Sequence, residues 1–145
     1  MIQFSKRLFY AIEAVLYIAY NAASDPMSSK EIASKQGMPP RYLEQMMQKL
    51  VRAGVLRGVR GPRGGYLLAR EKRRITLADI CTALGDDETI PTSTALGNQI
   101  VVPVIRKFQS SMVDQLHGTT IAELFDQATH CQIRKSVGER NDFNI

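Results

Sequence analysis

Residues 28–68 read SSKEIASKQGMPPRYLEQMMQKLVRAGVLRGVRGPRGGYLL, and this stretch decides the fold. It begins with SSKE at 28–31, the pattern of a capping box, in which the first serine accepts a backbone N–H and the glutamate reaches back to the cap residue. Gly37 is placed to end this short helix. A second helix begins near Pro40, because proline is tolerated in a first helical turn, and Gly54 ends it. The stretch therefore opens with two helices joined by a tight turn.

A glycine-rich hairpin follows the second helix. Strand-like runs at 55–60 and 66–68 flank the cluster Gly61-Pro62-Arg63-Gly64-Gly65. Arg60 and Arg63 belong to a loop so poor in side chains that its backbone can approach a groove closely, and arginine gains from the negative potential of a narrow minor groove. A plain surface turn is the alternative interpretation. Helix, turn, helix and hairpin together predict a winged helix-turn-helix, which holds its second helix in the major groove of DNA.

The second helix has two faces of different chemistry. Helical spacing places an apolar stripe on one side: Leu43, Met46, Met47, Leu50 and Val51. The opposite side is polar and carries Arg41, Gln45, Gln48 and Arg52. Arg and Gln can make paired hydrogen bonds to guanine and adenine edges. Glu44 could accept a hydrogen bond from a cytosine amino group, and Lys49 and Arg52 could hold phosphates. A merely solvated helix face is the alternative.

Charge divides the chain into two halves. Residues 1–74 contain fourteen Lys or Arg and five Asp or Glu, a net charge of +9, whereas residues 75–145 contain five and nine, a net charge of −4. The basic half carries the helix-turn-helix, as expected of a surface that meets phosphates, although a solvated basic surface would have the same composition. A chain of 145 residues can form one domain, or a small domain with a dimerisation extension.

Helices are also predicted on both sides of the central stretch. Residues 5–23 form an amphipathic helix with Lys6 in its first turn, where a helix prefers acids; this suggests an external anion, with simple solvation as the alternative. Thr76 and Asp79 cap a short helix that Gly85 ends. Residues 86–98 have little periodicity and predict an irregular loop.

A long helix is predicted to begin at Pro103. One face of it repeats apolar residues: Val104, Ile105, Phe108, Met112 and Leu116. Because the winged domain has a core of its own, we expect this stripe to pack against the same helix of a second subunit. Thr120 and Glu123 then cap a final short helix.

The overall prediction is a mainly α protein with a small β-hairpin wing. We expect a winged helix-turn-helix DNA-binding domain at 1–85, an irregular regulatory loop at 86–100, and a dimerisation helix with a short C-terminal helix at 101–145.

Several classes of protein are not indicated by the sequence. No apolar run reaches the roughly 20 residues of a membrane span, and there is no signal-peptide pattern, so we expect a cytoplasmic protein without membrane contact. Cys81 and Cys131 are too few for a disulfide framework. No nucleophile–base–orienter set or metal-ligand spacing is present, so we expect neither enzyme activity nor a metal site.

Three sequence motifs resemble those of the Rrf2 family of bacterial winged helix-turn-helix regulators. They are Tyr42-Leu43-Glu44-Gln45, Val59-Arg60-Gly61-Pro62 with Gly64-Gly65-Tyr66-Leu67-Leu68, and Thr120-Ile121-Ala122-Glu123-Leu124. The resemblance covers nearly the whole chain. It implies a transcription regulator, most simply a repressor, that binds a partly palindromic operator in double-stranded DNA as a homodimer joined by the long helix. It also implies that Tyr42, Glu44 and Gln45 face the major groove and that Arg60 enters the minor groove. The predicted DNA contacts of Arg41 and Arg63 are based on side-chain chemistry alone.

One departure from the family pattern concerns the signal. Members that sense iron–sulfur status usually carry three closely spaced cysteines in the loop before the long helix, and residues 86–98 contain no Cys or His. We therefore expect no cofactor and no Fe–S cluster of the usual kind. A small-molecule effector, a protein partner, or a thiol switch at Cys131 remain as alternatives. A winged-helix module that binds proteins instead of DNA is the rival function.

Overall fold

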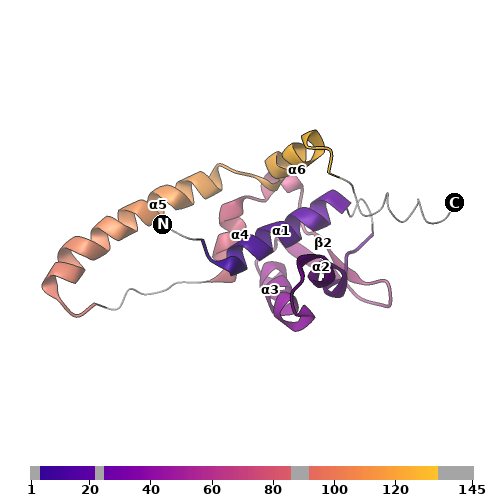
Figure 1. Cartoon of the computed structure of the whole chain (residues 1–145), viewed down its shortest axis with the longest axis horizontal. Helices are drawn as coiled ribbons and strands as arrows, with labels where there is room; N and C mark the ends of the chain where they lie inside the picture. Colours follow the sequence, from indigo (N-terminus) through magenta and orange to yellow (C-terminus); the bar gives the residue numbers. More distant parts are fainter. Residues whose placement is uncertain (1–3, 22–24, 86–91, 134–145) are drawn as a thin grey trace.

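The computed structural model describes residues 4–21, 25–85 and 92–133. In these residues the elements are α1 (Lys6–Asn21), α2 (Ser29–Gln36), α3 (Pro40–Arg52), β1 (Leu56–Val59), β2 (Gly65–Leu68), the 3-10 helix η1 (Lys72–Arg74), α4 (Leu77–Leu84), the π-helix η2 (Gly97–Val101), α5 (Val102–His117) and α6 (Ile121–His130). The predicted mainly helical fold with a small hairpin is confirmed (Figure 1).

The helix ends form where the capping residues predict them. The Ser28 hydroxyl accepts the Glu31 N–H at 3.1 Å, and Gly37 follows α2 in the left-handed conformation, with φ of 67°. Thr76 and Asp79 make both bonds of a capping box at the start of α4. Thr120 accepts the Glu123 N–H at 3.2 Å at the start of α6. These contacts lie within one turn of chain, which is why the sequence predicts them.

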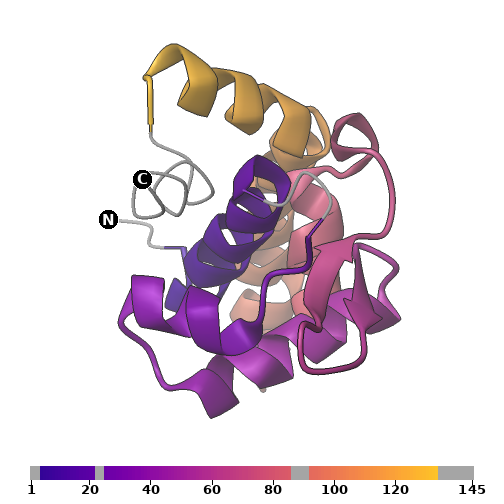
Figure 2. The same cartoon turned by 90° about the vertical axis from the view of Figure 1, so that its right-hand side faces the viewer.

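The core lies around α1. Its buried face meets the apolar sides of α2, α3, α4 and β2, and the fully buried large side chains include Ile18, Ile32, Leu43, Leu50, Leu56 and Ile80. Figure 2 shows α1 between α6 above and the helix-turn-helix below. Burying a side chain of this size contributes about 1.5–3 kcal/mol. The helix-turn-helix is therefore held by tertiary packing of its apolar stripe.

Helix α6 packs against the winged domain. Ile121 is fully buried in the same core as α1, and the Tyr20 hydroxyl donates a 2.5 Å hydrogen bond to the Ile133 carbonyl. The Lys72 ammonium lies 3.6 Å from the centre of the Phe125 ring, a cation–π contact between η1 and α6. The sequence groups α6 with the dimerisation helix, and in the structure the apolar face of α6 packs against α1 and η1 of the same chain.

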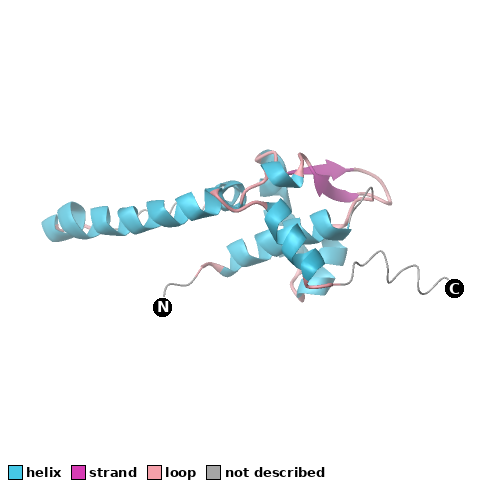
Figure 3. Cartoon of the chain, turned by 90° about the horizontal axis from the view of Figure 1, so that it is seen from above, coloured by secondary structure: helices cyan, strands magenta, loops and turns pink. Residues whose placement is uncertain are grey.

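Helix α5 extends away from this body, and the hairpin lies at the other end of the molecule (Figure 3). None of the residues of α5 is buried. The predicted irregular loop at 86–100 is partly wrong: helical backbone begins at Ala95, and η2 leads directly into α5. Residues 86–91 of that loop lie outside the described residues. No helix in the described part of the chain is long and apolar enough to cross a membrane.

Candidate nucleic-acid interface

Helix α3 presents a polar face to solvent. Arg41, Gln45 and Gln48 are exposed along it, and the Tyr42 side chain beside them is 38% exposed. Within the described residues these four side chains make no hydrogen bond or ion pair, so their polar groups are available to a ligand. The opposite face of α3 holds four buried residues, which fixes the direction of the exposed one. The helix can therefore offer donors and acceptors to base edges without any rearrangement of its core side.

The hairpin forms a compact wing tip with two arginines. Strands β1 and β2 pair antiparallel, from Leu56 opposite Leu68 to Val59 opposite Gly65. The Gly64 N–H donates to the Gly61 carbonyl at 2.9 Å, and a Cβ on Gly64 would overlap the Val59 carbonyl oxygen. Both Arg60 and Arg63 are exposed at this turn. The turn thus presents two guanidinium groups on a narrow backbone, a shape suited to a groove.

The Glu44 carboxylate is not freely exposed, as a carboxylate that only contacts bases would be. It is half-buried, and its two oxygens accept hydrogen bonds from two hydroxyls, one from Ser29 and one, at 2.5 Å, from Tyr66. These hydroxyls come from the start of α2 and from β2. Glu44 therefore joins both helices of the helix-turn-helix to the wing, and a contact with cytosine would have to use a lone pair that these two hydroxyls leave free.

Tyr66 fixes the base of the wing. Its N–H donates to the Met27 carbonyl at 2.8 Å, and its carbonyl accepts the Met27 N–H at 3.1 Å. Burial, and then the hydrogen bond and charge of Glu44, raise the pKa of the Tyr66 phenol above its usual value. The neighbouring Gly65 has no room for a side chain, because a Cβ there would overlap the Met27 backbone. The wing is thus held by backbone and side-chain bonds together.

The two predicted phosphate-binding lysines lie in different settings. Lys6 is exposed at the first residue of α1, and no helix-capping acid stands beside it. Lys49 is half-buried, and its ammonium donates to the Leu84 carbonyl at 3.3 Å, at the end of α4. Lys49 therefore points to the side of α3 that faces α4, away from the row formed by Arg41, Gln45 and Gln48.

The predicted dimerisation stripe lies open along α5. The exposed fractions of Val104, Ile105 and Phe108 are 48%, 39% and 60%, while Met112 and Leu116 are half-buried. The stripe extends further than predicted, since Leu96, Ile100 and Val101 are also exposed. Their i, i+4 and i+5 spacing ahead of Pro103 is the signal that could have revealed them.

Neither cysteine belongs to a site with recognisable ligands. Cys81 is half-buried against the core, and Cys131 is exposed just after α6. Among the described residues, no group of three His, Cys, Asp or Glu could hold a metal ion. The donors present there do not fit the thiolate ligand set of an Fe–S cluster. The absence of a cofactor in the whole chain stays a prediction.

Comparison with known proteins gives one family model over most of the chain. The model for Rrf2, described as an iron-dependent transcriptional regulator, matches residues 4–127. Among curated sequences, the HTH-type transcriptional regulator slr0846 of Synechocystis sp. is 32% identical over 139 residues, which cover 89% of this chain and 91% of slr0846.

The similarity to IscR proteins is seen in sequence and in structure. IscR of Xenorhabdus nematophila is 36% identical over 90 residues, 62% of this chain and 54% of that protein, so the chain spans about half its length. The solved structure of T. potens IscR superimposes with a TM-score of 0.74 and 30% identity, covering 95% of this chain and 96% of that one.

Proposed function

The chain belongs to the Rrf2 family of transcriptional regulators, a family of DNA-binding proteins and not of enzymes, and from this premise we propose that it is a homodimeric repressor of a partly palindromic operator. The observation that carries the proposal is the exposed polar face of α3. It stands on the second helix of the helix-turn-helix, with a wing that carries two arginines beside it. This arrangement supports base readout by α3 and minor-groove contact by the wing.

The roles of individual residues follow from their exposure. Arg41, Gln45 and Gln48 read base edges, with Tyr42 beside them, because these side chains are exposed on α3. Arg60 and Arg63 enter the adjacent minor groove, and Lys6 contacts the backbone. Glu44 acts mainly by holding the wing against α2 and α3, since both its oxygens already accept hydrogen bonds. Lys49 has a smaller part in DNA binding than its charge suggests, because its ammonium lies on the carbonyl end of α4.

The homodimer is supported by the open stripe on α5. A lone helix with an apolar face must bury it against another element, and the described part of the chain supplies no cover for most of that face. A second copy provides the same face by symmetry, as closed dimers do. Pairing two α5 helices fixes the separation of two α3 helices, which must match half-sites about one DNA turn, or about 34 Å, apart. The signal is sensed without the standard three-cysteine cluster.

DNA binding is tested with a fragment from upstream of the gene itself and a random fragment of equal length, by fluorescence anisotropy above physiological salt. The wild type should bind the upstream fragment more tightly, since nonspecific phosphate contacts weaken there. Gln45→Ala should reduce the preference by about 1–3 kcal/mol. Gln109→Ala on α5 is the matched control and should leave it unchanged. Equal, weak binding of both fragments by the wild type would favour a protein-interaction module.

A further inference from the structure

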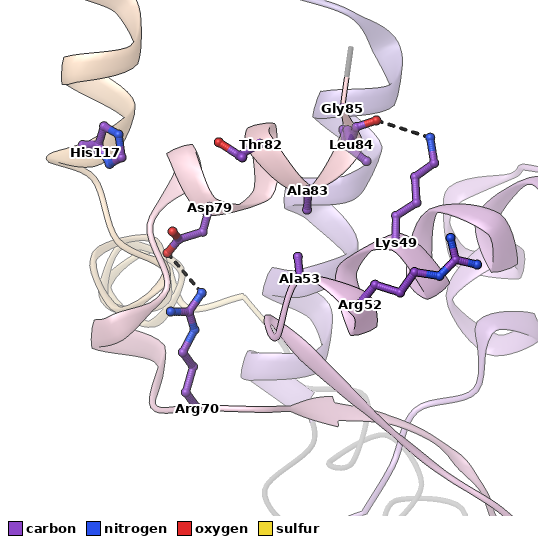
Figure 4. Close-up of a pocket in the computed structure, with 10 residues that line it drawn as sticks. All are labelled: Lys49, Arg52, Ala53, Arg70, Asp79, Thr82, Ala83, Leu84, Gly85 and His117. Carbon is purple, nitrogen blue, oxygen red and sulfur yellow. Dashed lines mark hydrogen bonds and ion pairs between the residues drawn. The ribbon is translucent and has the colours of Figure 1, made fainter. Parts of the chain in front are cut away.

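A pocket of about 740 Å³ lies between the end of α3, the outer side of α4 and the last turn of α5 (Figure 4). Its polar lining includes Lys49 and Arg52 from α3 and His117 from α5. Ala53 and Leu84 supply apolar surface between them. The pocket thus combines apolar walls with convergent cations, the general composition of a site for a small molecule.

The charges that the described residues bring to this pocket do not cancel. The Arg70 guanidinium lies 3.3 Å from an Asp79 carboxylate oxygen, so that pair is neutral. Lys49 is half-buried with its ammonium on the Leu84 carbonyl, and the exposed Arg52 makes no hydrogen bond or ion pair with any described residue. The carbonyl ends of α3 and α4 supply about half a negative charge each, which offsets one of the two cations. Among the residues that the structure describes, an excess of about one positive charge remains.

We propose that this pocket binds a small organic anion. A carboxylate or phosphate group would accept hydrogen bonds from Arg52 and Lys49, and the apolar body of the ligand would lie against Ala53 and Leu84. A guanidinium beside an ammonium matches such oxygens well, because charge-assisted hydrogen bonds are roughly twice as strong as neutral ones. The Asp79 carboxylate opposes the anion only weakly, since it is paired with Arg70 and also accepts the Thr76 N–H at 2.9 Å.

A DNA phosphate is the second source of the same chemistry, and the position of the pocket disfavours it. The N-terminal part of a recognition helix enters the groove, whereas Arg52 is the last residue of α3, roughly 18 Å along the helix from Pro40. The pocket also includes His117 of α5. A ligand held by Arg52 and Lys49 would touch α3, and any effect of this ligand on DNA binding rests on the proposed function.

The test is calorimetric titration of the full chain with phenyl phosphate and with benzoate, using neutral phenol as the uncharged control. At least one anion should bind with one site per chain, and phenol should not. Arg52→Gln and Lys49→Gln should each weaken binding by about tenfold or more, the loss expected for one charge-assisted bond. Arg63→Gln on the wing removes the same charge from another exposed arginine, and it should leave binding unchanged.

Several outcomes would overturn the proposal. One is the absence of binding by both anions, and another is an equal loss in the Arg63→Gln control. A third is an Arg52→Gln variant that binds the anions as well as the wild type but binds all DNA sequences more weakly. If the salt dependence of its DNA affinity also falls by about one unit of slope, Arg52 contacts a DNA phosphate. If the protein binds its DNA specifically but binds neither anion, the anion site is wrong and the proposed function is unaffected.

Discussion

At the scale of residues, the contact that most distinguishes the structure from the sequence prediction is the one between Glu44 and Tyr66. Glu44 lies on α3 next to Gln45 of the exposed polar row, and the sequence therefore predicts base readout. The structure pairs its carboxylate with hydroxyls from Ser29 and Tyr66, which are 15 and 22 residues away in the chain. Such a contact depends on how the hairpin folds back, and no local pattern encodes it. The exposed row of Arg41, Gln45 and Gln48 needed only helical spacing, and it was predictable.

Replacing Tyr66 by Phe should lower the free energy of unfolding by about 1.5–3 kcal/mol, the usual value of a hydrogen bond to a charged group. The half-buried Glu44 would keep the Ser29 bond and lose the other. Urea unfolding measures the difference. Tyr42→Phe is the matched control, because its exposed hydroxyl has no partner among the described residues, and it should leave stability unchanged. Equal stability of the Tyr66→Phe variant and the wild type would mean that the link contributes nothing.

The same phenol should make stability depend on pH in alkaline solution. Its pKa is raised in the folded state by burial and by Glu44, so between the usual value near 10 and the higher folded value the folded protein holds a proton that the unfolded chain has lost. The contribution of the Tyr66 phenol to the free energy of unfolding is therefore fully present below about pH 10, and it is lost as the pH rises further. Unfolding of the wild type and of Tyr66→Phe from pH 9 to 11 should show the advantage of the wild type shrinking; a constant difference would contradict the shift.

At the scale of elements, helix ends were predictable and the approach to α5 was not. The hydroxyls of Ser28, Thr76 and Thr120 each accept a hydrogen bond from the backbone N–H three residues later, so each cap can be recognised from a short local motif. The π-helix at Gly97–Val101 has no such signature, and residues 92–98 resemble a loop in composition. The packing of α6 against α1 is a contact between distant segments, and no local pattern in the sequence predicts it.

The wing depends on the absence of a side chain at Gly65. In Gly65→Ala the new Cβ would meet the Met27 backbone, and the bonds between Met27 and Tyr66 would have to open. We expect a loss of more than about 1 kcal/mol in unfolding free energy, as in other overpacked sites, together with weaker DNA binding. Gly58→Ala on the partner strand meets nothing within 4 Å and is the control. Similar stabilities of the two variants would contradict this account of the wing.

At the scale of the whole molecule, the open stripe of α5 is expected to hold two copies together. Phe108 is 60% exposed near the middle of that stripe, and a charge placed there would have to be buried in the dimer. Phe108→Glu should therefore yield a folded monomer in sedimentation experiments, while the wild type sediments as a dimer. Ser110→Glu places a negative charge on the opposite side of α5 and should stay dimeric. A monomeric wild type would contradict the assignment of the stripe.

The junction after α5 has a mechanical consequence. The Leu77 N–H donates to the Thr119 carbonyl at 2.9 Å, and the Ile121 N–H donates to the Ile75 carbonyl at 2.8 Å, so the end of α5 is bonded to the start of α4 through a short ladder. A joint of this kind resists swivelling, and a tilt of α5 must carry the whole winged body with it. Over its 16 residues, about 24 Å, a tilt of roughly ten degrees displaces the far end by about 4 Å, close to the 3.4 Å rise of one base pair. In the proposed dimer, such a tilt would change the separation of the two α3 helices by about one base-pair step.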